Sequence, residues 1–246
     1  MKVQGIIFDL GFTLITIPNF NLKEYNRLMK AGLLDLEQYL KSIGLINDSQ
    51  DFYKTTRRIQ KNHFKNYFTT DIEFTAEGIL QESFQKFNFK FNEELIKKSA
   101  KICHQHEINS WELRNGVIPV LRRLSKEYKL AIISNAIYHE GIIEILKKLK
   151  VYEYFDLVLS SAKVGIRKPN KAIFQEALTQ LNLLAKSCIF IGDDMYADIC
   201  GAKRLHIKAI HIKRGFQLPM PKNILVKADH EINEIPEILG ILDNHH

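Results

Sequence analysis

Carboxylates stand at the ends of two largely apolar runs in the sequence. Asp9 follows residues 3–8, and the pair Asp193 and Asp194 follows a second run, with Asp198 one helical turn further on. Carboxylates that converge on one place repel one another unless a cation neutralises them, and ligand sets made only of oxygen favour a hard ion such as Mg²⁺. We therefore expect a metal site if the fold brings these runs together.

Hydroxyl and basic side chains follow two other apolar runs. Ser134 and Asn135 follow residues 129–133, and three basic residues come after a run that starts at residue 155: Lys163, Arg167 and Lys168. A divalent ion combined with a lysine and a hydroxyl suits an oxyanion, and phosphate is the usual one. Each feature alone is also typical of a turn or a helix N-cap. Four of them in order, each at the end of an apolar run, favour a functional site.

The elements that must position these residues form an alternating pattern. Short runs rich in β-branched residues, each followed by turn or polar residues, occur at 2–11, 129–136, 155–163, 187–194 and 207–215. Between them, apolar residues recur at helical spacing over residues 116–128, 139–152, 171–184 and 197–206. This alternation predicts an α/β fold with a Rossmann-like doubly wound parallel sheet. Ligands of such sheets bind beyond the carboxyl ends of the strands, which is where the polar residues fall.

Residues 15–112 interrupt the alternation. This segment contains helical patterns at 22–44, 51–68, 75–87 and 92–107 and almost no strand pattern. Helix-rich sequence inserted after the first strand of a parallel sheet is typical of a lid or cap. We therefore predict an all-helical cap domain over residues 15–112, and a catalytic core made of residues 1–14 and 113–246.

Four stretches, in this order, resemble the motifs of the haloacid dehalogenase superfamily of phosphatases and related enzymes. They read IIFDLGFTL (6–14), LAIISNA (130–136), YFDLVLSSAKVGIRKPNKAIFQEAL (154–178) and CIFIGDDMYADICGAKRLHIKAIHI (188–212). The resemblance covers residues 3–14 and about 113–237, which is the whole predicted core. The inserted segment is similar to the family only in its position and its helical character.

The resemblance implies a metal site and a nucleophile. The first and fourth motif strands would lie side by side, so that Asp9, the backbone carbonyl of Gly11 and Asp193 share one Mg²⁺. Asp9 would attack phosphorus and form an aspartyl-phosphate that water then hydrolyses. Asp198 would orient the surroundings of the metal or a bound water.

The same resemblance implies how the substrate is held. Ser134 and the backbone amide of Asn135 would bind phosphate oxygens, and Lys168 would balance the negative charge on Asp9 and on the phosphoryl group. The implied activity is a phosphoric monoester hydrolase that acts on a small phosphorylated metabolite. Sugar phosphates, phosphoglycolate-like acids and nucleotides all fit these motifs.

Gly11 departs from the family pattern. Similar phosphatases usually carry a second Asp here, whose side chain protonates the leaving oxygen and later activates water. A positioned acid and base of this kind contributes ~10²–10⁴-fold in rate. We therefore expect a slow enzyme, an enzyme limited to good leaving groups, or an enzyme served by the substrate, a water, Tyr138 or His139. The local reason for a glycine would be a tight turn that needs positive φ.

Two alternatives follow from the same departure. A catalytically weakened phosphate-binding or regulatory protein on this fold is favoured by Gly11. It is opposed by Asp9, Lys168 and Asp193, because a pure scaffold has no need to bring three charged groups together. A haloacid dehalogenase also lacks the second Asp, but dehalogenases need no Mg²⁺ and generally lack the acidic pair in GDDMYAD (192–198).

The composition is ordinary for a soluble globular protein, because 46% of the 246 residues are hydrophobic and 26% are charged. The formal net charge of +7 suits an anionic substrate, or a lysine-rich surface without further function. Three widely spaced cysteines indicate neither a zinc knuckle nor a disulfide framework, and reduced thiols predict a cytoplasmic protein. No run approaches the length of a membrane span, and nothing in the sequence indicates the oligomeric state.

Two stretches of the predicted cap contain residues that also occur in metal sites or in nucleic-acid binders. In CHQH (103–106), His104 and His106 are two apart and do not share a helix face, so we expect a packed or exposed helix and no metal site. In RRIQKNHFKNYF (57–68), basic and aromatic residues mix as in nucleic-acid binders. Phe64, Tyr67 and Phe68 have the spacing of a packed helix face, so we expect no nucleic-acid partner.

Overall fold

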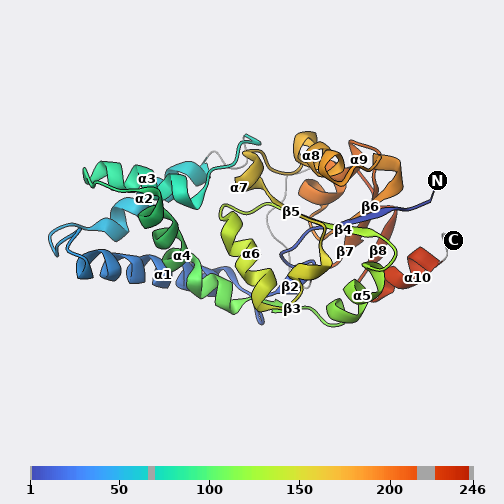
Figure 1. The fold of residues 1–246 in the computed structure, drawn as a ribbon, viewed down its shortest axis with the longest axis horizontal. Helices are drawn as coiled ribbons and strands as arrows, with labels where there is room; N and C mark the ends of the chain where they lie inside the picture. Colours follow the sequence, from blue (N-terminus) through green and yellow to red (C-terminus); the bar gives the residue numbers. More distant parts are fainter. Residues whose placement is uncertain (1, 66–69, 215–224, 244–246) are drawn as a thin grey trace.

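The computed structural model describes residues 2–65, 70–214 and 225–243. Within them, six strands form a parallel sheet in the order β5-β4-β1-β6-β7-β8 (Figure 1). The strands are β1 (Gly5–Phe8), β4 (Lys129–Ser134), β5 (Leu157–Ser160), β6 (Cys188–Gly192), β7 (Lys208–Ile212) and β8 (His230–Ile232). The chain starts in the middle of the sheet, runs to one edge and then fills the other side, so β1 and β6 become neighbours at the switch point. The predicted doubly wound parallel sheet is confirmed.

Helices cover both faces of this sheet. On one face lie α5 (Val117–Leu124), α6 (His139–Lys148) and α10 (Glu237–Asp243), and on the other lie α8 (Lys171–Leu181) and α9 (Gly201–Lys203) (Figure 1). Successive residues of a strand point to opposite faces. Accordingly, Ile6 and Phe8 pack into the first core and Ile7 into the second. Burial on both sides explains why the strands read as continuous apolar runs.

The structure differs from the sequence prediction at three elements of the core. The run 155–163 is strand only to Ser160, whose side chain accepts a hydrogen bond from the Lys163 amide and so starts the short helix α7 (Ser161–Val164). The predicted helix 197–206 is a π-helical turn (Met195–Cys200) followed by α9. Strand β8 was not predicted, because its three residues offer no β-branched run.

Four helices occupy the segment between two short strands, β2 (Ile15–Thr16) and β3 (Glu112–Leu113), which pair antiparallel. They are α1 (Leu22–Ser42), α2 (Phe52–Lys65), α3 (Ala76–Lys86) and α4 (Glu93–Ser110). Three of them begin at a residue whose side chain accepts an amide hydrogen bond of the first turn: Asn21, Thr75 and Asn92. Figure 1 shows α1–α4 together beyond the end of the sheet.

Three sequence expectations can be compared with the fold: those on membrane spans, on thiols and on the packed helix face of residues 57–68. Within the described residues, no helix has both the length and the apolar character needed to cross a membrane. The three cysteines, Cys103, Cys188 and Cys200, are buried free thiols. Phe64 does not pack into a helix core as expected, because it is 46% exposed and lies beside Phe74 with ring centroids 4.9 Å apart. Tyr67 and Phe68 lie outside the described residues.

Candidate active site

The carboxylates of Asp9 and Asp193 come together because β1 and β6 end side by side. Phe8 and Ile191 are register partners, and the Asp9 amide donates to the Ile191 carbonyl at 2.8 Å. The Thr13 hydroxyl lies 3.1 Å from Oδ2 of Asp9 and 3.3 Å from Oδ1 of Asp193. All three side chains are buried. Thr13 therefore fixes the two carboxylates relative to each other, a role that the sequence did not indicate.

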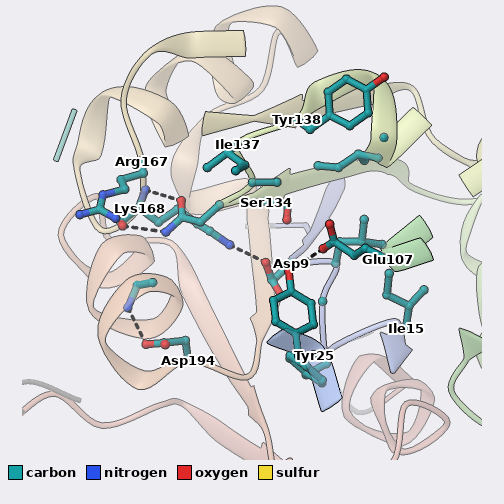
Figure 2. Close-up of a pocket in the computed structure, with 18 of the residues that line it drawn as sticks. Asp9, Ile15, Tyr25, Glu107, Ser134, Ile137, Tyr138, Arg167, Lys168 and Asp194 are labelled. Carbon is teal, nitrogen blue, oxygen red and sulfur yellow. Dashed lines mark hydrogen bonds and ion pairs between the residues drawn. The ribbon is translucent and has the colours of Figure 1, made fainter. Parts of the chain in front are cut away.

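Lys168 is the cation at the centre of this cluster. Its Nζ donates to Oδ1 of Asp9 at 2.7 Å, to Oδ1 of Asp198 at 2.6 Å and to the Ile133 carbonyl at 2.7 Å, which uses all three donors of the ammonium. The residue is only 3% exposed. Burial alone would lower the pKa of Lys168, but the charges of Asp198 and Asp9 outweigh burial and raise the pKa. Lys168 is therefore positively charged beside Asp9 (Figure 2).

Asp198 is held by backbone geometry as well as by Lys168. Its second oxygen, Oδ2, accepts a hydrogen bond from the Asp194 amide at 3.0 Å. A Cβ at position 192 would lie 2.3 Å from that same oxygen, so the close approach of Asp198 to β6 requires Gly192. Both oxygens of Asp198 are thus engaged by the protein itself.

The acidic cluster has the properties of a site for a hard cation. One oxygen each from Asp9, Asp193 and Asp198 lie within 4.8 Å of one another. Burial and the charges of Asp9 and Asp198 raise the pKa of Asp193 well above its ordinary value, although Arg214, which forms an ion pair with Asp193, opposes the shift. A divalent ion would relieve this repulsion, and the donors are all oxygen, so the residues fit Mg²⁺.

Ser134 and Asn135 lie at the carboxyl end of β4. Both residues line the same cavity as Asp9. The Asn135 side chain accepts a hydrogen bond from the Lys168 amide at 2.8 Å and donates to the Lys168 carbonyl at 2.9 Å. This side chain therefore holds the backbone of Lys168, which the sequence analysis did not foresee. Of the other polar residues at these strand ends, Arg167 and Asp194 border the cavity and Lys163 does not.

Gly11 does not adopt the conformation that the sequence suggested. Its φ is not positive, and the positive φ in this loop, 59°, belongs to Phe12. A Cβ at position 11 would meet Trp111 at 3.6 Å, which is an ordinary van der Waals contact. The expectation that a tight turn requires glycine here is therefore wrong. A side chain at position 11 would have room beside the Trp111 ring.

A cavity of about 700 Å³ extends from this cluster towards helices α1, α2 and α4. Of the two substitute acids considered from sequence, Tyr138 lines the cavity. His139 does not, and its Nδ1 lies 3.0 Å from the Ser160 hydroxyl. Burial, with the charge of Glu77, raises the pKa of Tyr138 and keeps the phenol neutral.

Among the polar residues that the inserted helices contribute to the cavity, three that the sequence analysis missed or set aside contact one another: Tyr25, His104 and Glu107. Tyr25 donates to Oε1 of Glu107 at 2.7 Å, and Nδ1 of His104 lies 2.8 Å from Oε2 (Figure 2 labels Tyr25 and Glu107). Tyr25 is 82 positions away from Glu107. No spacing rule connects residues so far apart, so the packing of α1 on α4 alone brings them together.

Comparison with known protein families gives one match over most of the chain. The family model of haloacid dehalogenase-like hydrolases matches residues 6–212. Among curated relatives, the glyceraldehyde 3-phosphate phosphatase of Methanothermobacter thermautotrophicus is 37% identical over 245 residues, covering 96% of this chain and 100% of that protein. The protein of the same name from Pyrococcus furiosus is 27% identical over 243 residues, covering 98% and 94%.

Solved structures are similar in fold at low sequence identity. A HAD phosphatase from Thermococcus onnurineus superposes with a TM-score of 0.61 at 21% identity, covering 98% of each chain. A 2-haloacid dehalogenase from Pseudomonas syringae pv. Tomato DC3000 gives a TM-score of 0.64 at 18% identity, covering 99% of this chain and 100% of the other. At these identities the likeness concerns the fold alone.

Proposed function

Because the chain belongs to the haloacid dehalogenase-like hydrolase family, we propose that it is a Mg²⁺-dependent phosphatase that acts through an aspartyl-phosphate on Asp9. One observation carries the proposal. The Asp9 carboxylate stands between a charged lysine, whose Nζ is 2.7 Å away, and a second carboxylate from the neighbouring strand. A nucleophile, a countercharge and an oxygen ligand set thus meet at the edge of the sheet where ligands bind.

Each of these residues has a task in phosphoryl transfer. An oxygen of Asp9 attacks phosphorus, and Lys168 balances the negative charge that collects on the phosphoryl group. Ser134 binds phosphate oxygens together with the Asn135 amide, while the Asn135 side chain holds the Lys168 backbone in place. Asp198 positions Lys168 through the hydrogen bond to Nζ.

Mg²⁺ would be held by Asp9, Asp193 and the Gly11 carbonyl, and when bound it supplies positive charge to phosphate oxygens. Asp198 would stay outside this ligand set, because its oxygens are occupied by Lys168 and the Asp194 amide. The same acidic cluster supports a phosphatase over a dehalogenase. A reaction that proceeds without Mg²⁺ does not require a second carboxylate, Asp193, as a metal ligand beside Asp9.

The relatives suggest the first substrate to try. Several of them are named glyceraldehyde 3-phosphate phosphatase, so we propose a small phosphorylated metabolite and place triose phosphates first. A cavity of about 700 Å³ is ample for a small metabolite, since typical ligand sites have ~300–1,000 Å³. We further propose that residues 15–112 act as a cap that excludes water and selects the substrate over a core of residues 1–14 and 113–246.

The test is hydrolysis of p-nitrophenyl phosphate by the wild type and by Asp9→Asn, with and without Mg²⁺. This substrate has a good leaving group and makes little demand on an acid. We expect turnover that requires Mg²⁺ and is abolished in Asp9→Asn. Asp35→Asn is the matched control, because Asp35 is an exposed aspartate of α1 outside the cavity lining.

A wild type no faster than Asp9→Asn would remove the support for a phosphatase. The alternative, a phosphate-binding or regulatory protein, is favoured by the glycine at position 11. Gly11→Asp then distinguishes the two, because a Cβ at position 11 makes only an ordinary van der Waals contact, with Trp111 at 3.6 Å. Recovered turnover in Gly11→Asp would indicate a disabled phosphatase. If Gly11→Asp also lacks turnover, the result would support a protein that only binds phosphate.

A further inference from the structure

A partly buried carboxylate and a buried histidine form a pair on the wall of the cavity that the helices α1 and α4 provide. Nδ1 of His104 lies 2.8 Å from Oε2 of Glu107. His104 is 4% exposed and lines the cavity that also contains Asp9. No described residue forms a hydrogen bond with Nε2 of His104, so this is the ring nitrogen available to a bound substrate.

Glu107 is held in its ionised form. Burial alone would raise its pKa, but the hydrogen bonds from His104, Tyr25 and Trp111, together with the charge of His104, outweigh burial and lower the pKa. A carboxylate in this state orients the imidazole with Nδ1–H towards it and stabilises an imidazolium, as the acid partner does in Ser-His-Asp enzymes. The pair is therefore arranged for proton transfer at Nε2.

Two contacts place this pair opposite the phosphate site. Trp111 hydrogen-bonds Glu107 and is also the residue that a side chain at position 11 would touch, at 3.6 Å. On the other flank, the His104 ring lies on Tyr138 with centroids 5.0 Å apart, and Tyr138 follows Ser134 by four residues at the end of β4. The pair thus spans the space between the loop after β1 and the loop after β4.

We propose that His104, oriented by Glu107, is the catalytic acid and base that replaces the aspartate missing at position 11. The proposal rests on the phosphatase function proposed above. When Asp9 attacks phosphorus, the bond from phosphorus to the leaving oxygen breaks. That oxygen then takes the proton from Nε2 of His104, which leaves a neutral imidazole whose Nδ1–H still points at Glu107.

Hydrolysis of the aspartyl-phosphate reverses the proton movement. Nε2 of the neutral His104 takes a proton from water as the water oxygen bonds to phosphorus. The bond from phosphorus to Asp9 then breaks and returns the carboxylate. The cycle converts one phosphomonoester and one water into an alcohol and inorganic phosphate, and restores the His104 imidazolium.

The test compares two substrates of similar shape, p-nitrophenyl phosphate and phenyl phosphate, whose leaving groups differ in acidity. In His104→Asn, the amide still offers a donor near Glu107 but has no counterpart of Nε2. We expect kcat/KM for phenyl phosphate to fall by ~10²-fold or more, and kcat/KM for p-nitrophenyl phosphate to change much less. The ratio of the two values does not depend on the fraction of folded protein, so partial unfolding leaves the comparison valid.

His106→Asn is the matched control, because His106 lies on the same helix, is exposed, contacts Asp35 and does not line the cavity. Its ratio should equal that of the wild type. The double variant His104→Asn, Gly11→Asp adds a carboxylic acid at position 11, which lines the cavity, and should regain much of the lost phenyl phosphate activity. Such a rescue is not expected if His104 only supports the structure.

Each other outcome overturns an identifiable claim. An equal loss on both substrates, or a change confined to KM, would show that His104 binds or packs and does not transfer the proton. If the wild type hydrolyses p-nitrophenyl phosphate through Asp9 but His104→Asn keeps the wild-type ratio, only the acid assignment fails. If the wild type hydrolyses neither substrate, the phosphatase function fails and the acid assignment fails with it.

Discussion

Lys168 belongs to the candidate site and also affects the stability of the fold. It is buried with its ammonium between Asp9 and Asp198, each at or below 2.7 Å. Removing one member of a buried ionic group leaves the remaining charges without a partner. The loss of folding free energy is then far larger than the net stabilisation that the complete group provides. In this respect the lysine differs from the exposed ion pairs of the surface, such as Lys97 with Glu93.

For Lys168→Met we expect a loss of about 3–5 kcal/mol in the free energy of unfolding, together with loss of phosphatase turnover. The methionine fills similar space but leaves two buried carboxylates unpaired. Urea unfolding followed by circular dichroism measures the change. Lys97→Met is the control, and it should change the free energy of unfolding far less, because its ion pair is exposed to solvent. A stability of Lys168→Met equal to that control would contradict the electrostatic account.

Among the elements, the pairing of α1 with α4 depends on one small residue. A Cβ at position 32 would lie 1.9 Å from the Cys103 carbonyl oxygen, so the two helix backbones touch at Gly32. The same pairing brings Tyr25 on α1 to Glu107 on α4. The close approach at Gly32 therefore supports the geometry of the cavity wall although Gly32 does not line the cavity.

Replacing Gly32 by alanine should destabilise the protein by about 1–3 kcal/mol, the usual cost of overpacking, despite the better helix propensity of alanine. The added methyl forces α1 and α4 apart, because the obstacle is backbone. Gly240→Ala is the matched control: this glycine lies in α10 and its Cβ would meet nothing within 4 Å. Thermal unfolding measures the melting temperatures of both variants. Equal melting temperatures would refute the proposed contact.

At the scale of the whole molecule, the inserted segment is docked on the core beside Lys168. The loop before α3 forms hydrogen bonds with the segment that follows β5. The Arg167 amide donates to the Asp71 carbonyl at 2.9 Å, and the Ser161 hydroxyl donates to Oε2 of Glu73 at 2.6 Å. Thr70 and Asp71 of this loop line the same cavity as Lys168.

We expect Glu73→Ala to weaken this docking and to raise KM for p-nitrophenyl phosphate several-fold, because a buried hydrogen bond to a carboxylate contributes about 1.5–3 kcal/mol. The residues that we propose to contact phosphate are unchanged, so kcat should change less than KM. Steady-state kinetics measure both values. Glu94→Ala, an exposed glutamate of α4, should leave KM unaltered. An unchanged KM in Glu73→Ala would mean that the docking does not govern access to the site.

The sequence by itself determined the alternating strands and helices, the family and the residues at the strand ends. These signals are local, because an apolar run followed by Asp9 or Asp193 reads directly as a buried strand with a polar end. The right-handed crossover then fixes which end of the sheet those residues share. For this reason the fold prediction was confirmed, and the predicted site residues Asp9, Ser134, Lys168 and Asp193 line one cavity.

Tertiary structure decided what lies between elements that are distant in sequence. The Thr13 hydroxyl between two carboxylates, the Asn135 side chain on the Lys168 backbone and the Glu107–His104 pair follow no periodicity in the chain. Spacing set His104 aside as a helix residue without a site, and only the packing of α1 and α4 on the core turned it towards the cavity. Side-chain partners of this kind depend on how whole elements pack, and that information is not local.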